Sequence, residues 1–289
     1  MKKEWEKDRG LFIRMFITMF LLAVIYLAFI AVLSVLGVSI VPIIIIAGIM
    51  LFAQYYFSDR LVLMSTGAQI VNENEAPELH EIVSRLCMNA DIPKPKVAIV
   101  QSSIPNAFAT GRNKKRAVVA VTTSLMKQLD KSELEAVLAH ELSHIKNKDV
   151  LVLTIAGFFS TIAFFLVRYL MFFGGRDRDS GGIIIVWIVS VIVWLLSFFL
   201  IRALSRYREF AADRGSAILT GQPSNLISAL LKISGTMERV PKRDLREAEG
   251  MNAFYIIPAL SGESILGLFS THPHLEKRIE ALERIERVL

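Results

Sequence analysis

The stretch MFITMFLLAVIYLAFIAVLSVLGVSIVPIIIIAGIMLFAQYYFS occupies positions 15–58 and contains no charged residue. About 20 apolar residues cross a lipid bilayer as an α-helix, so this run is too long for one span. Gly37 and Pro42 interrupt it near its middle. The sequence therefore predicts two membrane helices, at about 15–36 and 38–57, joined by a very short turn.

Two further stretches, 150–167 and 180–201, also lack charged residues. They predict a second pair of membrane helices, at about 150–173 and 182–201, joined by a polar loop. Charged residues make up only 21% of the 289 residues, and all of them lie outside the uncharged stretches. This pattern excludes a wholly soluble enzyme, a disordered protein and a secreted disulfide scaffold. The single cysteine, Cys87, is expected to be a reduced, buried thiol.

The basic residues indicate the orientation of the chain in the membrane. Several precede the first predicted span and several follow the last, whereas the two connecting turns carry no net positive charge. The positive-inside rule then places the N-terminus and residues 58–149 and 202–289 in the cytoplasm. Because the bases that give the net charge of +6 lie beside apolar segments, we expect a lipid bilayer and no nucleic acid as partner.

The chain is thus expected to be a mostly α-helical membrane protein with four transmembrane helices and a cytosolic α+β domain. The expected parts are an N-terminal tail with a transmembrane hairpin at 1–57, a cytosolic part at 58–149, a second transmembrane hairpin at 150–201, and a second cytosolic part at 202–289.

The cytosolic parts show recognisable local patterns. Predicted elements are an amphipathic helix at 75–90, strands at 96–101, 106–110 and 117–122 with a hairpin turn at 111–115, and a C-terminal helix from about 274. Ser132 is expected to cap a helix that begins at Glu133. The charged residues of the C-terminal helix are expected to face solvent.

The helix from Glu133 contains the sequence His140-Glu141-Leu142-Ser143-His144, which has the pattern H-E-x-x-H. Residues four apart share one face of a helix, so both imidazoles can hold one zinc ion. Glu141 borders the same position and can take a proton from a water molecule bound there.

A catalytic zinc site usually has a third protein ligand and leaves its fourth position to water. Asp149 is close in sequence but lies out of register, at the helix end. Glu209 is the better candidate, and Asp213 lies one turn further along the same predicted helix. A carboxylate at Asp213 can accept the second ring N–H of a ligand histidine.

At these residues the chain resembles the HtpX family of integral-membrane zinc metallopeptidases, relatives of the prenyl-protein CAAX proteases. The resemblance covers nearly the whole chain and includes Asn106-Ala107-Phe108-Ala109-Thr110-Gly111, the H-E-x-x-H segment, Glu209-Phe210-x-Ala212-Asp213 and Ser270-Thr271-His272-Pro273. It implies a gluzincin-like catalytic domain and proteolysis in stress-related quality control of membrane proteins. The implied location is the bacterial cytoplasmic membrane. It further implies one zinc ion held by His140, His144 and Glu209, with Glu141 as the base.

The resemblance also suggests that residues Asn106, Ala107, Phe108 and Ala109 form an edge strand above the zinc. A substrate can add to such an edge through its main chain, although a plain hairpin strand is the alternative. His272 either stabilises the developing oxyanion or helps to cap the C-terminal helix.

Sequence spacing gives a location for the site. His144 lies six residues before Val150, and Glu209 lies seven residues after Arg202. At 1.5 Å per residue both ligands lie roughly 10 Å beyond the span ends. Both ligand helices are therefore expected to continue the third and fourth spans. The expected substrates are cytosolic or juxtamembrane segments of membrane proteins.

The sequence is also compatible with two other classes of protein. One is a membrane receptor or scaffold with a structural or regulatory metal, and the other is a transporter. A transporter is disfavoured because the uncharged spans contain no ionisable residue to mark a pathway. A closed structural zinc site takes four protein ligands, whereas three good candidates are visible. The sequence carries no signal of an oligomeric state.

Overall fold

The structure is a computed structural model that describes residues 9–35, 37, 40–173, 180–237 and 272–289. The chain divides into two compact units. The described parts of the first unit lie within Phe57–Val150 and Arg206–Leu289, and the second unit comprises Arg9–Tyr56 and Leu151–Ser205.

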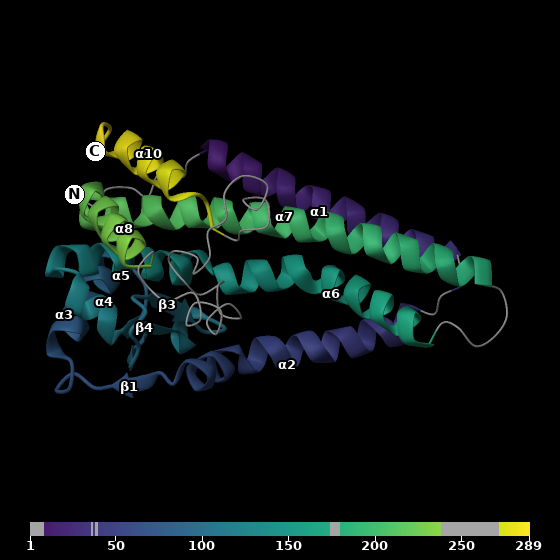
Figure 1. Cartoon of the computed structure of the whole chain (residues 1–289), viewed down its shortest axis with the longest axis horizontal. Coiled ribbons are helices and arrows are strands. Elements are labelled where there is room, and N and C mark those ends of the chain that lie inside the picture. The colour runs from purple at the N-terminus through teal and green to yellow at the C-terminus, as the bar shows by residue number, and fades with distance from the viewer. Residues whose placement is uncertain (1–8, 36, 38–39, 174–179, 238–271) are drawn as a thin grey trace. The chain divides into compact units, whose positions relative to one another are not determined.

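Figure 1 shows the helices and strands along the chain. They are α1 (Arg9–Val35), α2 (Ile40–Thr66), β1 (Gln69–Val71), α3 (Pro77–Ala90), β2 (Lys96–Val100), β3 (Ala107–Thr110), a 3₁₀ turn at Lys114–Arg116, β4 (Val118–Thr122), α4 (Thr123–Gln128), α5 (Lys131–Asn147), α6 (Asp149–Phe173), α7 (Ser180–Thr220), α8 (Pro223–Met237) and α10 (Leu275–Glu286).

Membrane-type helices make up the second unit. Among the described residues, Arg9–Val35 and Gly182–Thr220 are long and apolar enough to cross a membrane, and the bent pair Asp149–Phe158 and Ser160–Arg168 makes a third if it counts as one span. The expectation of membrane helices is thus confirmed. The expected number of four spans stays a prediction.

The helices of the second unit pack through large apolar side chains. Leu22 and Phe29 of α1 are almost fully buried, together with Ala163 of α6 and Val193 of α7. The hydroxyl of Tyr26 donates a hydrogen bond of 2.7 Å to the carbonyl of Ala156, which joins α1 to α6.

The first unit contains a four-stranded mixed sheet in the order β1-β2-β4-β3. β2 and β4 are parallel, and the two outer strands, β1 and β3, pair antiparallel to their neighbours. The three predicted strands are confirmed, and β1 is an addition that the sequence did not suggest. β3 forms one edge of the sheet.

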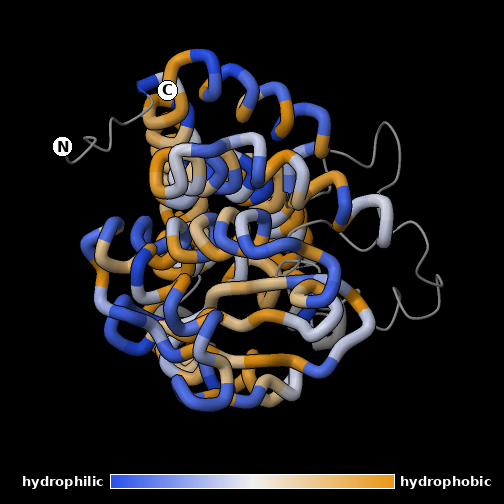
Figure 2. The backbone as a smooth tube through the Cα atoms, turned by 90° about the vertical axis from the view of Figure 1, so that its left-hand side faces the viewer, coloured by the Kyte–Doolittle hydropathy of each residue, from blue (hydrophilic) through white to orange (hydrophobic). Residues whose placement is uncertain are grey.

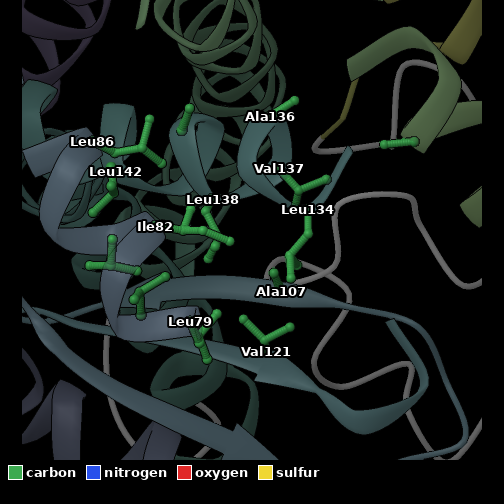
Figure 3. Close-up of a cluster of buried hydrophobic side chains, with 14 of the residues drawn as sticks. Leu79, Ile82, Leu86, Ala107, Val121, Leu134, Ala136, Val137, Leu138 and Leu142 are labelled. Atoms are coloured by element: carbon green, nitrogen blue, oxygen red, sulfur yellow. The ribbon is translucent and has the colours of Figure 1, made fainter. Parts of the chain in front are cut away.

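Apolar strands and amphipathic helices build the core of this unit. In the tube coloured by hydropathy (Figure 2) the strands are mostly orange, because β2 and β4 read Lys-Val-Ala-Ile-Val and Val-Val-Ala-Val-Thr. Figure 3 shows Ile82 and Leu86 of α3 among side chains of α5, with Val121 of β4 beside the small Ala107 of β3. Burial of each such large side chain contributes about 1.5–3 kcal/mol to stability.

Helix α5, which carries the H-E-x-x-H segment, begins two residues earlier than predicted. The cap is Asp130 rather than Ser132: its Oδ1 accepts hydrogen bonds from the backbone N–H groups of Ser132 and Glu133 at 3.0 and 2.9 Å. The side chain of Glu133 in turn accepts from the backbone of Asp130 at 3.0 Å. This reciprocal pair is a capping box, and the Asp130-x-x-Glu133 spacing was its sequence signal.

Polar contacts fix α5 against three other helices. Arg85 of α3 donates to Glu135 at 2.8 Å, and the hydroxyl of Ser216 of α7 donates to the carbonyl of Ala136 at 2.6 Å. Glu133 accepts from Ser228 and Lys232 of α8, both at 2.6 Å. Because these contacts link distant segments of the chain, the position of α5 depends on the tertiary fold.

The two helices that carry the predicted ligands differ in whether they are continuous with the predicted membrane spans. Glu209 lies on α7, which is one helix from Ser180 to Thr220, as expected. The helix of His144 does not run on into α6, and that expectation was wrong. Lys148, at φ 59°, adopts the left-handed conformation and ends α5, and α6 begins at Asp149.

The turn between β3 and β4 requires a glycine at position 111. Gly111 has φ +130°, and a Cβ there would lie 2.6 Å from the Cα of Ala117, whereas Gly221 has φ +70° and nothing within 4 Å. Gly111→Ala should therefore lower the thermal unfolding temperature of the purified protein much more than Gly221→Ala, whose strain costs only about 1–2 kcal/mol. Equal shifts for the two variants would show that the close approach at Gly111 is unimportant.

Candidate metal centre

The two histidines of the H-E-x-x-H segment lie on the same face of α5. Their Nε2 atoms are 3.2 Å apart and their rings meet edge to face, with centroids 4.8 Å apart. The His140 residue is 1% exposed, so its ring is shielded from solvent. Two imidazole nitrogens that face each other at this distance form half of a tetrahedral ligand set.

Glu209 of α7 completes a group of three donors. Its Oε2 lies 3.6 Å from Nε2 of His140, and its Oε1 lies 3.5 Å from Nε2 of His144. Among the described residues these three side chains form the group that could hold a metal ion, with ligand atoms all within 4.8 Å of one another.

The spacing of the donors fits zinc. With metal–ligand bonds of 2.0–2.1 Å and tetrahedral angles, neighbouring ligand atoms lie about 3.3–3.4 Å apart. The two histidine nitrogens are 3.2 Å apart, and each lies 3.5–3.6 Å from a different carboxylate oxygen of Glu209. Two imidazole nitrogens and a glutamate carboxylate are also donor types that hold zinc in catalytic sites.

The outer ring nitrogen of each histidine faces an aspartate. Nδ1 of His140 lies 2.9 Å from Oδ1 of Asp213, as the sequence suggested for that residue. Nδ1 of His144 lies 2.7 Å from Oδ2 of Asp149. Asp149 is not one of the three donors; it follows the left-handed Lys148, begins α6 and meets the outer nitrogen of His144, a contact that the sequence did not suggest.

Each aspartate is in turn paired with a buried arginine. Arg278 of α10 donates to both carboxylate oxygens of Asp213, at 2.8 and 2.6 Å. Arg208 of α7 contacts Asp149. The charged residues of the C-terminal helix were expected to face solvent, and for Arg278, only 1% exposed, that expectation was wrong. No signal in the spacing of that helix distinguishes Arg278 from its exposed neighbours.

Charge and burial act in opposite directions on Arg278. Burial lowers the pKa of a guanidinium, but the carboxylates of Asp213 and Glu209 outweigh it and raise the pKa of Arg278. Arg278 is therefore a permanent cation within 3.8 Å of Oε2 of Glu209.

Glu141 is buried beside the three donors and is not one of them. Burial raises the pKa of Glu141, and the nearby histidines oppose that shift. The backbone N–H of Ala109 on β3 also donates to its carboxylate. The strand suggested for substrate binding and the acid suggested as base are thus in direct contact, which holds the edge strand next to the group of donors.

His272 also lies next to Glu209. Its Nδ1 is 3.2 Å from Oε2 of Glu209, and the residue is 6% exposed. Helix α10 begins at Leu275 with His274 at its cap position, so His272 is not the capping residue. Thr271 lies outside the described residues.

The sequence has close relatives in a known peptidase family. The profile described as Peptidase family M48 matches residues 73–286. "Protease HtpX homolog 2" of Methanosarcina mazei is 62% identical over 291 residues, which cover 99% of both chains. "Protease HtpX homolog" of Moorella thermoacetica is 61% identical over 293 residues, covering 99% of this chain and 98% of the relative.

A solved structure supports the fold. The crystal structure of S. mikatae Ste24p matches 95% of this chain and 67% of that chain with a TM-score of 0.57, at 19% sequence identity. This likeness concerns the fold alone, whereas the sequence relatives and the family profile define the kind of protein. The chain therefore belongs to peptidase family M48, in which it groups with the HtpX proteases.

Proposed function

We propose that the protein is a membrane-bound, zinc-dependent endopeptidase with one zinc ion held by His140, His144 and Glu209. The observation that carries this proposal is the group of His140, His144 and Glu209, whose ligand atoms all lie within 4.8 Å of one another, within a chain of peptidase family M48. Three protein ligands leave a fourth position for water or substrate, as catalytic zinc sites require.

Glu141 is the proposed general base and acid. When bound, zinc polarises the scissile carbonyl and activates the attacking water. Glu141 takes the proton of that water and then returns it to the leaving amine.

His272 is the proposed donor to the developing oxyanion. It reaches the site from the segment before α10 and lies against Glu209, so its ring borders the reacting carbonyl in this proposal. A donor placed there stabilises the transition state more than the bound substrate.

The substrate is proposed to bind along β3. This strand lies at the sheet edge and includes Ala107, Phe108 and Ala109, with Asn106 just before it. Pairing with an edge strand uses main-chain hydrogen bonds, so it tolerates many substrate sequences. The hydrogen bond from Ala109 to Glu141 supports this location, because it joins the edge strand to the proposed base.

The proposed setting is the cytoplasmic membrane, with four spans and with the termini and site in the cytosol. The basic residues that flank the predicted spans support this orientation. The proposed role is quality control of membrane proteins through cleavage of their cytosolic or juxtamembrane segments. The alternative is a receptor or scaffold in which the metal serves structure or regulation alone.

Replacement of the third ligand tests the metal site. Glu209→Gln keeps the size of the side chain but removes its charge, and it should abolish stoichiometric zinc binding and cleavage. Asp213→Asn should lose roughly 10–100-fold in zinc affinity. Glu133→Gln, which alters another buried carboxylate of the same unit, is the control and should retain zinc. Elemental analysis of the purified variants measures the outcome, and full zinc content in Glu209→Gln would remove Glu209 from the ligand set.

Glu141→Gln separates an enzyme from a scaffold. The variant should fold and bind zinc like the parent, because the amide keeps the shape of the side chain. Peptide cleavage should fall by at least about 100-fold, the lower end of the contribution of general acid–base catalysis. Parental cleavage rates with zinc bound would contradict the mechanism, and a scaffold would show no proteolysis in either protein.

The position of Glu209 only seven residues beyond Arg202 on one continuous helix predicts a preference for sites near the membrane. A set of substrates should carry one cleavable segment at increasing distance from their own membrane span, in proteoliposomes. Cleavage should be fastest for segments close to the span. Equal cleavage of a free soluble domain that contains the same segment would argue against this location.

A further inference from the structure

Asp149 and Arg208 form a buried ion pair beside the metal centre. Each residue is only 5% exposed, and their side chains are in direct contact. Nη2 of Arg208 also donates a hydrogen bond of 2.9 Å to the carbonyl of Asn147, the last residue of α5. Arg208 thus joins the end of α5 and the start of α6 to α7.

The same pair determines how the ring of His144 is held. Oδ2 of Asp149 lies 2.7 Å from Nδ1 of His144. An ionised carboxylate only accepts hydrogen bonds, so Nδ1 carries the proton and Nε2 keeps its lone pair. Nε2 of His144, which carries this lone pair, lies 3.5 Å from Oε1 of Glu209 and 3.2 Å from Nε2 of His140.

The place of Arg208 in the chain adds a second effect. It is the residue before Glu209, so its bond to the end of α5 fixes the register of α7 where the third donor lies. Movement of this end of α7 would change the distances from Glu209 to both histidines. One arginine therefore affects both the orientation of His144 and the position of Glu209.

We propose that Asp149 and Arg208 are positioning residues of the metal centre, which hold His144 in its metal-binding tautomer and hold Glu209 at ligand distance. The proposal rests on the proposed zinc site. An ion pair with a merely structural role would contribute to stability alone. A positioning role requires zinc affinity to change as well, by more than the change in stability explains.

The experiment measures zinc affinity of the purified full-length protein in detergent, by competition with a chelator of known zinc affinity. Asp149→Asn should lose roughly 10–100-fold in zinc affinity. Arg208→Lys keeps the charge but cannot bridge Asp149 and Asn147 with one planar group, so its loss should be smaller. Cobalt-substituted Asp149→Asn should show altered visible absorption bands, because they report the geometry of the ligands.

Glu133→Gln is the control, since it removes the charge of a buried carboxylate of α5 that pairs with the exposed Lys232 of α8, away from the three donors. It should lower the unfolding temperature of the metal-free protein but leave zinc affinity unchanged. In Asp149→Asn/Arg208→Gln both charges are absent, so the unfolding temperature should exceed that of Asp149→Asn, whereas zinc affinity should fall further, because the bond of Arg208 to Asn147 that positions Glu209 is lost as well.

Parental zinc affinity in Asp149→Asn, or an equal loss in Glu133→Gln, would overturn the proposal. If Asp149→Asn does not fold, Arg208→Lys decides the question by the same measurement. Failure of the proposed function looks different: the parent would then bind zinc through His140, His144 and Glu209 without cleaving any peptide. Zinc affinity would still test the role of Asp149 and Arg208 in that case.

Discussion

The antiparallel contact between α5 and α7 is the interaction on which the rest of the first unit depends. Four polar contacts follow one another along it. At one end the hydroxyl of Ser216 donates to the carbonyl of Ala136, and at the other end Arg208 donates to the carbonyl of Asn147. Between them, Asp213 faces His140 and Glu209 faces both histidines. A shift of either helix by one residue would break all four contacts together. The geometry of the donor group is therefore a property of the helix pair.

Burial of so many charged groups is costly unless each one has a partner, because the interior solvates ions poorly. Asp149, Glu209 and Asp213 are all buried here, and Arg208 and Arg278 are buried with them. The pairing draws α10 onto α7, since Arg278 reaches both oxygens of Asp213. The same low-dielectric surroundings raise the pKa of Glu141. One electrostatic environment thus holds the C-terminal helix against α7 and shifts the protonation equilibrium of Glu141.

Patterns within one element were predictable from the sequence, and contacts between elements were not. The strands near 96–101 and 117–122 followed from runs of β-branched residues, and their pairing came from the fold. The cap at Asp130 was missed although the capping-box spacing was present. The contact of Asp149 with His144 was not predicted, because it depends on the break between α5 and α6 at the left-handed Lys148. Arg278 was assigned to a solvated face, because helical spacing cannot show which polar residue meets a buried partner.

The sequence by itself determined the membrane-type helices, the common face of His140 and His144, and the candidacy of Glu209 and Asp213, because each follows from spacing along a single helix. Only the tertiary structure decided the distances of 3.2–3.6 Å among the donors, the contact of β3 with Glu141, and the arginine behind each aspartate. Helical periodicity fixes the face on which a side chain lies. The partner that it meets there depends on the packing of segments far apart in the chain, which minimises exposed apolar surface and unpaired buried charge together.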